Sequence, residues 1–266
     1  MIFIKDLLSP IDSDRNFQAY FNKVTYPIIL SLLYIISQGA LHAETYVVCV
    51  GIGNYAEPKI PNLVKTEKDA ISMVSFYKKG TKNVITITGK YATKAQILNS
   101  IRSQFARAKD SDKIVFYFSG HGYSGGFCPY DMHSIRDGLT YSDVVNVMAK
   151  SKAKDKIIFA DACNSGAIRQ NQSSSKPNTG NVLLFLSSRG NENSIESPLL
   201  SNGFFTNYLL HGLGGKADAN GDKAITAKEL FDFVSQGVIQ LSKNSQHPVM
   251  WGNFPDNMVI VKYRKR

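Results

Sequence analysis

Two short apolar runs, each followed at once by small and polar residues, constrain the fold of this chain more than any other feature. Residues 156–166 read KIIFADACNSG, and residues 113–122 read KIVFYFSGHG. Apolar runs of this length that end in turn residues are typical of buried parallel strands. Open α/β sheets bind their ligands beyond the carboxyl ends of such strands. The pattern therefore predicts that Cys163 and His121 lie at the same edge of a parallel sheet.

Strands and helices alternate along the chain after residue 44. The expected strands are residues 46–52, 84–88, 114–118, 157–160, 182–186 and 258–261. The expected helices are residues 66–79, with Thr66 as N-cap, and residues 93–108, 141–149, 204–213 and 227–241. Such alternation favours a mostly parallel sheet with helices on both faces. We therefore predict one α/β domain over residues 44–266.

The first 43 residues have the pattern of a leader. Residues 28–36 form an uncharged apolar run that follows Lys23 and precedes small residues up to Ala43. This arrangement is typical of an export signal cleaved before Glu44, and the run is shorter than the ~20 residues of a membrane-spanning helix. We expect an exported protein, periplasmic or secreted, without a stable membrane span after cleavage. Because the segment before the run is long and carries no net charge, an uncleaved anchor or an ordinary N-terminal helix stays open.

Charge and cysteine spacing exclude several classes of function. The net charge of +10 favours anionic partners, but the basic residues are scattered and do not interleave with aromatic ones, so we expect no specific nucleic-acid binding. The three cysteines have no C-x-x-C spacing, which disfavours zinc sites and redox dithiols. Cys49 lies in an apolar run and is expected to be a buried thiol. In an exported protein, a disulfide between Cys49 and Cys128 stays open.

Cys163 and His121 are the residue types of a Cys–His nucleophilic pair, in which the imidazole activates the thiol. Gly120 and Gly122 flank the histidine, and glycine lets a substrate approach the backbone closely. The backbone N–H groups of Gly122 and Cys163 are expected to form the oxyanion hole of an acyl-transfer enzyme. The histidine precedes the cysteine, at a separation similar to that in caspases.

Residues 116–122 (FYFSGHG) and 157–166 (IIFADACNSG), in this order, resemble the two catalytic motifs of caspase-like cysteine peptidases. They are most similar to the metacaspase, paracaspase and bacterial caspase-like branches. The resemblance covers about residues 46–261, with support from residues 50–55, 68–70, 186–189 and 245–248. It implies a caspase-like three-layer α-β-α sandwich with a mostly parallel central sheet. It also implies a His–Cys dyad in which Cys163 is the nucleophile, His121 protonates the leaving amine, and no cofactor is required.

The resemblance further implies that substrates carry Arg or Lys at P1. Asp161 stands where metacaspases and paracaspases have an aspartate of the S1 pocket, and Asp69 stands where they have a second acid. Glu196 falls where caspases have the arginine that selects aspartate. Three acids in one pocket repel one another unless a cation neutralises them, which favours a basic P1 side chain. Ordinary roles stay open for each: a helix first-turn acid for Asp69, a turn cap for Asp161 and a surface acid for Glu196.

Residues 170–181 (QNQSSSKPNTGN) contain no apolar side chain, so we expect an exposed, mobile linker between the two halves of the domain. With a basic P1 preference, Arg169 and Lys176 become candidate sites of self-cleavage. Two other functions stay open. One is a catalytically silent interaction module with a caspase fold. The other is an active peptidase with an acidic P1 preference, which only Arg189 would support. The oligomeric state is not indicated.

Residues 218–229 (DANGDKAITAKE) resemble the calcium loop of an EF-hand. Positions 1, 3, 5 and 12 of that loop are filled by Asp218, Asn220, Asp222 and Glu229. The glycine expected at position 6 is replaced by Lys223. The same residues also read as a turn followed by a T-x-x-E capping box. Bound calcium therefore stays open beside this alternative.

Overall fold

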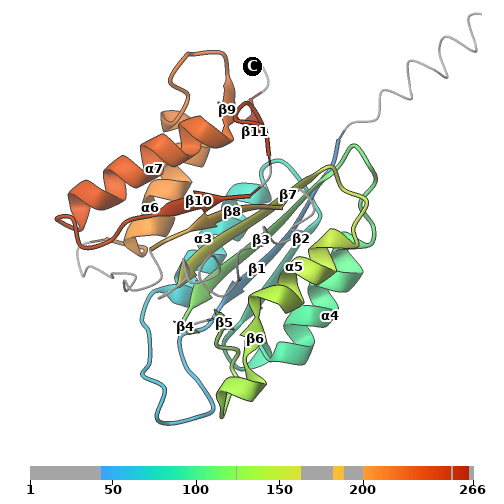
Figure 1. The fold of residues 1–266 in the computed structure, drawn as a ribbon, viewed down its shortest axis with the longest axis vertical. Helices are drawn as coiled ribbons and strands as arrows, with labels where there is room; N and C mark the ends of the chain where they lie inside the picture. The colour runs from blue at the N-terminus through green and yellow to red at the C-terminus, as the bar shows by residue number, and fades with distance from the viewer. Residues whose placement is uncertain (1–42, 124, 163–181, 189–199, 253, 264–266) are drawn as a thin grey trace, which may run out of the picture. The chain divides into compact units, whose positions relative to one another are not determined.

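The computed structural model describes residues 43–123, 125–162, 182–188, 200–252 and 254–263. Its central feature is a six-stranded sheet in the order β10-β8-β7-β3-β1-β2 (Figure 1). The parallel strands are β1 (Thr45–Gly51), β2 (Val84–Thr88), β3 (Lys113–Gly120), β7 (Asp155–Ala162) and β8 (Val182–Leu186). The edge strand β10 (Val249–Trp251) runs antiparallel to β8. The sheet is thus mostly parallel, as predicted.

Helices cover both faces of this sheet (Figure 1). One face is covered by α4 (Lys94–Phe105) and α5 (Tyr141–Ala149), and the other by α3 (Thr66–Tyr77), α6 (Phe204–His211) and α7 (Ala227–Leu241). Side chains of β1 alternate between the two cores: Val48 and Val50 pack under α4, whereas Val47 and Cys49 pack under α3. Because both faces are buried, the strands are continuously apolar. The three-layer α-β-α sandwich is confirmed.

Strand pairing near the end of the chain differs from the prediction. A strand near residues 258–261 is present as β11 (Val259–Lys262), but it pairs with β9 (Ala224–Thr226) in a separate two-stranded sheet. The central sheet is closed instead by β10, which is too short to show a period. A three-stranded sheet of β4 (Gly122–Tyr123), β5 (Gly126–Phe127) and β6 (Leu139–Thr140) was also not predicted, for the same reason.

Helix ends are set by individual capping residues. Thr93 caps α4 by accepting the N–H of Gln96 (3.2 Å), and Thr226 forms a capping box with Glu229 at the start of α7. The prediction for Thr66 is wrong, because α3 begins at this residue and its buried hydroxyl has no partner among the described residues. Short helical turns are η2 (Gly89–Tyr91), η3 (Ile135–Asp137) and η5 (Gly212–Lys216). No helix of the described ranges could cross a membrane.

Cys49 and Cys128 are both free and buried. Cys49 packs in the core under α3, and Cys128 packs in the core on the opposite face of the sheet. The sheet therefore separates the two thiols, and the disulfide that the sequence left open does not form. Burial raises the pKa of Cys49 well above its ordinary value, so this thiol is chemically inert, as predicted for a core residue.

The parallel sheet has two different edges in the direction of its strands. Connections from a strand to the next helix leave at one edge, and connections from a helix to the next strand enter at the other. Asp161 and His121 lie at or just beyond the strand ends of the first edge, which we call the β-to-α edge. Ligands of open α/β sheets bind at this kind of edge.

Candidate active site

His121 directly follows β3 and is held by the loop between β1 and α3. Its backbone N–H donates to Oη of Tyr55 (2.7 Å), and its Nε2 lies 2.8 Å from the carbonyl oxygen of Pro61. The two rings are also neighbours, with centroids 5.3 Å apart. A carbonyl oxygen can only accept, so this contact places a proton on Nε2 and leaves Nδ1 as the acceptor when the ring is neutral.

The loop that holds His121 is itself closed by a backbone hydrogen bond. The N–H of Leu63 donates to the carbonyl oxygen of Gly53 (2.8 Å). A Cβ on Gly53 would lie 2.7 Å from the carbonyl oxygen of Leu63, so this close approach requires glycine. Neither Tyr55 nor Pro61 was predicted as a site residue. Tyr55 could have been found, since it lies in residues 50–55, which already carried the resemblance; a backbone carbonyl leaves no such signal.

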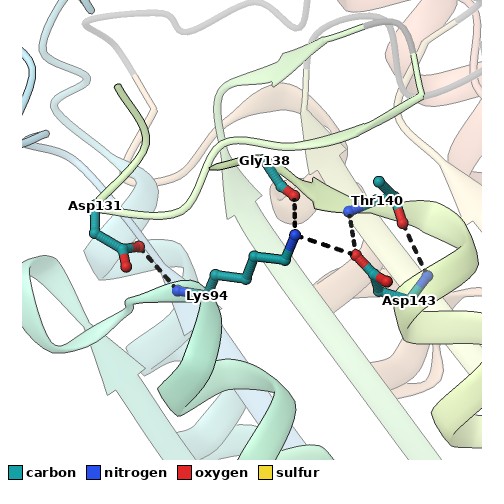
Figure 2. Close-up of polar contacts among 5 residues, drawn as sticks. All are labelled: Lys94, Asp131, Gly138, Thr140 and Asp143. Atoms are coloured by element: carbon teal, nitrogen blue, oxygen red, sulfur yellow. Dashed lines mark hydrogen bonds and ion pairs between the residues drawn. The ribbon is translucent and has the colours of Figure 1, made fainter. Parts of the chain in front are cut away.

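A polar network fastens the chain segment that follows the histidine (Figure 2). The backbone N–H of Lys94 donates to Asp131 (2.9 Å), and Nζ of the same lysine donates to the carbonyl oxygen of Gly138 (2.7 Å). Nζ also lies 3.6 Å from Asp143, which forms the capping box of α5 with Thr140. The loop between β5 and β6 is thereby tied to the first turns of α4 and α5.

Cys163 lies outside the described residues, and so do Glu196, Arg169 and Lys176. The strand before the cysteine, β7, ends at Ala162, which pairs in register with Gly120 at the end of β3. The two strands that precede the predicted dyad therefore end side by side. The dyad, the oxyanion hole at Gly122 and Cys163, and the cleavage sites stay predictions.

The end of β7 is secured by residues that carried the family resemblance. Oγ of Ser187 donates to the carbonyl oxygen of Ala162, and the N–H of Ala162 donates back to this hydroxyl, each at 3.1 Å. Nε2 of the buried Gln246 donates to the carbonyl oxygen of Ser187 (2.8 Å). Residues 186–189 and 245–248 thus act together, because each supports the strand that leads to Cys163.

Asp69 on α3 and Asp161 on β7 come together at the β-to-α edge. Both are buried, with 2% and 6% of their surface exposed. Both carboxylates face Gly203, since a Cβ there would lie 2.8 Å from Oδ2 of Asp161 and 3.4 Å from Oδ2 of Asp69. Two of the three predicted S1 acids therefore converge on one place, and Glu196 lies outside the described residues.

Both carboxylates accept several hydrogen bonds. Asp69 accepts from Oγ of Ser119 (3.0 Å), Nδ2 of Asn202 (2.7 Å) and the N–H of Gly203 (3.2 Å). Oδ2 of Asp161 accepts from Oγ1 and from the N–H of Thr206, at 2.7 and 3.2 Å. These backbone N–H groups belong to the start of α6, where the helix dipole favours negative charge. Asp161 thus caps a helix distant in sequence rather than its own turn.

The acid pair is electrostatically coupled. Burial, together with the nearby charge of Asp161, raises the pKa of Asp69 to about 7. The same two carboxylates and burial raise the pKa of Tyr117, whose hydroxyl lies 2.6 Å from that of Thr206. Two carboxyls that share a buried site bind one proton between them near neutral pH unless a cation takes its place. This arrangement can bind an ammonium or guanidinium group.

The EF-hand-like loop uses its acids for internal hydrogen bonds. Asp218 accepts from the N–H groups of Gly221 (2.9 Å) and Lys223 (3.0 Å), and the carboxylate of Glu229 accepts from Thr226. Within the ranges that the structure describes, no group of three or more Asp, Glu, His or Cys residues is arranged to hold a metal ion. The capping-box interpretation describes this geometry, and calcium stays a prediction from sequence.

Comparisons with known proteins agree with the fold and the motifs. Residues 45–259 match the family model of the caspase domain of C14 peptidases. Among solved structures, protein GSU0716 from Geobacter sulfurreducens superposes with a TM-score of 0.58 at 17% identity, over 78% of this chain and 92% of that one. At this identity the similarity concerns the fold alone. No curated protein matches the sequence. The family match covers most of the chain, and the protein therefore belongs to the caspase-domain family.

Proposed function

We propose that the protein is a cysteine endopeptidase that cleaves after Arg or Lys. The observation that carries the proposal is the buried pair of Asp69 and Asp161 at the β-to-α edge, next to the strand ends that precede His121 and Cys163. A bound P1 guanidinium would replace the shared proton and allow both carboxylates to ionise. An acidic P1 side chain would add a third negative charge to the site and is disfavoured.

The expected reaction is acyl transfer in two steps. His121 takes the proton of the Cys163 thiol, and the thiolate attacks the scissile carbonyl carbon. The N–H groups of Gly122 and Cys163 would stabilise the resulting oxyanion. The C–N bond then breaks, and the imidazolium gives its proton to the departing amine. Water, deprotonated by the same histidine, hydrolyses the thioester and restores the thiol.

Pro61 supports the charged state of the histidine in this scheme. Its carbonyl oxygen, 2.8 Å from Nε2, accepts from both the neutral ring and the imidazolium, and the bond to the imidazolium is stronger because it is charge-assisted. No carboxylate partner for the histidine is needed. The proton that moves during the reaction is the one at Nδ1, so Nε2 keeps its contact throughout.

Fluorogenic peptides that differ only in Arg, Lys or Asp at P1 test the proposal. The protein should turn over the Arg and Lys peptides, and Cys163→Ala should abolish turnover. Asp161→Asn should lower kcat/KM for these peptides by at least about a hundredfold, because the buried cation loses its partner. The exposed Asp222→Asn is the matched control and should behave as wild type. Asp161→Asn should still react with iodoacetamide at Cys163.

Two outcomes would overturn the proposal. Preferential cleavage of the Asp peptide would show the acidic specificity that Arg189 could support. If the wild-type chain turns over no peptide and Cys163 does not alkylate faster than a free thiol, the domain is a silent interaction module. Adding calcium or a chelator to the same assay tests whether residues 218–229 bind a metal that affects activity.

Self-cleavage and export are further parts of the proposal. A basic P1 preference places the cut after Arg169 or Lys176, and intact mass of wild type and Cys163→Ala locates it. Both chains remaining uncut would exclude it. Export is proposed from residues 28–43, and N-terminal sequencing of the protein from its native cell would show whether the mature chain begins at Glu44.

A further inference from the structure

The sheet edge opposite the acid pair carries a concentrated positive charge. Three connections from helix to strand arrive there, formed by residues 78–83, 106–112 and 150–154. Beyond the helix caps they expose the basic residues Lys79, Lys82, Arg107, Lys109, Lys152 and Lys154. None of these six forms an ion pair with another described residue. We call this surface the basic edge.

Helix dipoles explain only part of this charge. Lys78 and Lys150 are the C-caps of α3 and α5, where a cation is favourable. The six residues of the basic edge lie past these caps. Exposed acids in and beside the same connections are fewer, namely Glu44 and Asp110. A surface of mostly one sign repels itself and attracts an anionic partner.

A hollow in the same edge has apolar walls. The cavity, of about 680 Å³, lies at the start of β7 between Lys154 and the chain that precedes β11. Its walls include Phe254, Pro255, Met258 and Val259, and Pro255 and Val259 are exposed. Apolar side chains beside lysines match the boundary between lipid head groups and acyl chains. A nucleic-acid backbone would instead be met by polar and charged groups.

The chain reaches the folded domain at this edge. The N–H of Glu44 donates to Asp112 (2.9 Å), and Thr45 pairs with Lys113 at the start of β3. Figure 1 shows β1 beginning at the end of the sheet opposite β4 and β5. Seven residues separate the apolar run of residues 28–36 from residue 44. They span at most ~25 Å, so a membrane that takes up this run is within reach of the basic edge.

We propose that the basic edge docks on an anionic phospholipid surface. The β-to-α edge, with His121 and the acid pair, then faces away from the membrane toward protein substrates. Because the attraction acts between exposed charges, it weakens when salt shortens the screening length to a few ångströms. The proposal rests on charge and topology and does not depend on peptidase activity.

Co-sedimentation of the full chain with vesicles tests the docking. Vesicles of phosphatidylcholine alone are compared with vesicles that also contain phosphatidylglycerol. Wild type should bind the anionic vesicles at least about a hundredfold more tightly, and high salt should remove the difference. A variant with Lys79, Lys109, Lys152 and Lys154 changed to Glu should lose this preference. Since all variants keep the same leader, its own membrane affinity cancels.

A matched control separates the basic edge from net charge. Lys59, Lys90, Arg136 and Lys243 are exposed elsewhere, and changing them to Glu alters the total charge equally. This control should keep most of the lipid preference. The Lys→Gln version of the edge variant, intermediate in effect, serves if the Glu version does not fold. Equal binding to both vesicle types, equal losses in edge and control variants, or tighter binding to duplex DNA than to anionic vesicles would overturn the proposal.

Discussion

Removing the charge of Asp69 should stabilise the fold at neutral and alkaline pH. Burial and the nearby charge of Asp161 raise the pKa of Asp69 from 3.8 to about 7. Between these values the folded protein binds one more proton than the unfolded chain, so its stability falls as the pH rises. At about 1.4 kcal/mol per pKa unit, the penalty is about 1.5 kcal/mol at pH 5 and about 4 kcal/mol at pH 8.

Asparagine at this position removes the penalty and keeps the hydrogen bonds. Oδ1 of Asp69 accepts from Asn202 and Gly203, and the amide oxygen of asparagine can replace it. Oδ2 faces the hydroxyl of Ser119 at 3.0 Å, and a hydroxyl can accept from an amide N–H as well as donate. The variant should therefore gain about 1.5 kcal/mol at pH 5 and about 4 kcal/mol at pH 8 over wild type.

Urea unfolding at a series of pH values measures this gain, with both chains carrying Cys163→Ala to prevent self-cleavage. Asp112→Asn is the control, since its two carboxylate oxygens accept the backbone N–H groups of Glu44 and Lys109. An amide nitrogen cannot accept, so this control should lose about 1–2 kcal/mol. A gain for Asp69→Asn that is the same at pH 5 and pH 8 would refute the coupling of the two acids.

Three further substitutions test how the site is held. Gly203→Ala places a Cβ 2.8 Å from Oδ2 of Asp161 and should lower kcat/KM for Arg peptides at least about tenfold, while Cys163 alkylation is unchanged. Tyr55→Phe removes the acceptor of the His121 N–H; it should lower kcat about tenfold with little change in KM, and equal changes in both would argue against positioning. Asp131→Ala removes a carboxylate that accepts an N–H at the start of α4 and should cost about 1 kcal/mol in thermal unfolding; an unchanged Tm would contradict this.

Local patterns in the sequence were enough for the layers of the fold. The runs before His121 and Cys163 are continuously apolar because both faces of a central parallel strand are covered, and this holds wherever the strands pair. The capping box of Thr226 and Glu229 and the buried thiol of Cys49 are local as well. Each depends on neighbours within a few residues, or on burial alone, and can be recognised without knowing the tertiary structure.

Other features depended on which distant segments pack together. The two-residue strands and β10 are too short to show a period, and an apolar run such as β11 does not indicate its partner strand. The acid pair forms only because α3, β7 and the start of α6 meet, and its coupling follows from shared burial. The contact of Pro61 with His121 uses a backbone carbonyl, which every residue has.

The sequence by itself therefore determined the strands, their order of reactive residues and the family. Only the tertiary structure decided that lysines scattered between residues 79 and 154 form one surface opposite the candidate active site. The physical reason is the parallel sheet: all its parallel strands begin at one edge and end at the other, so residues before strands and residues after strands are sorted to opposite ends of the domain.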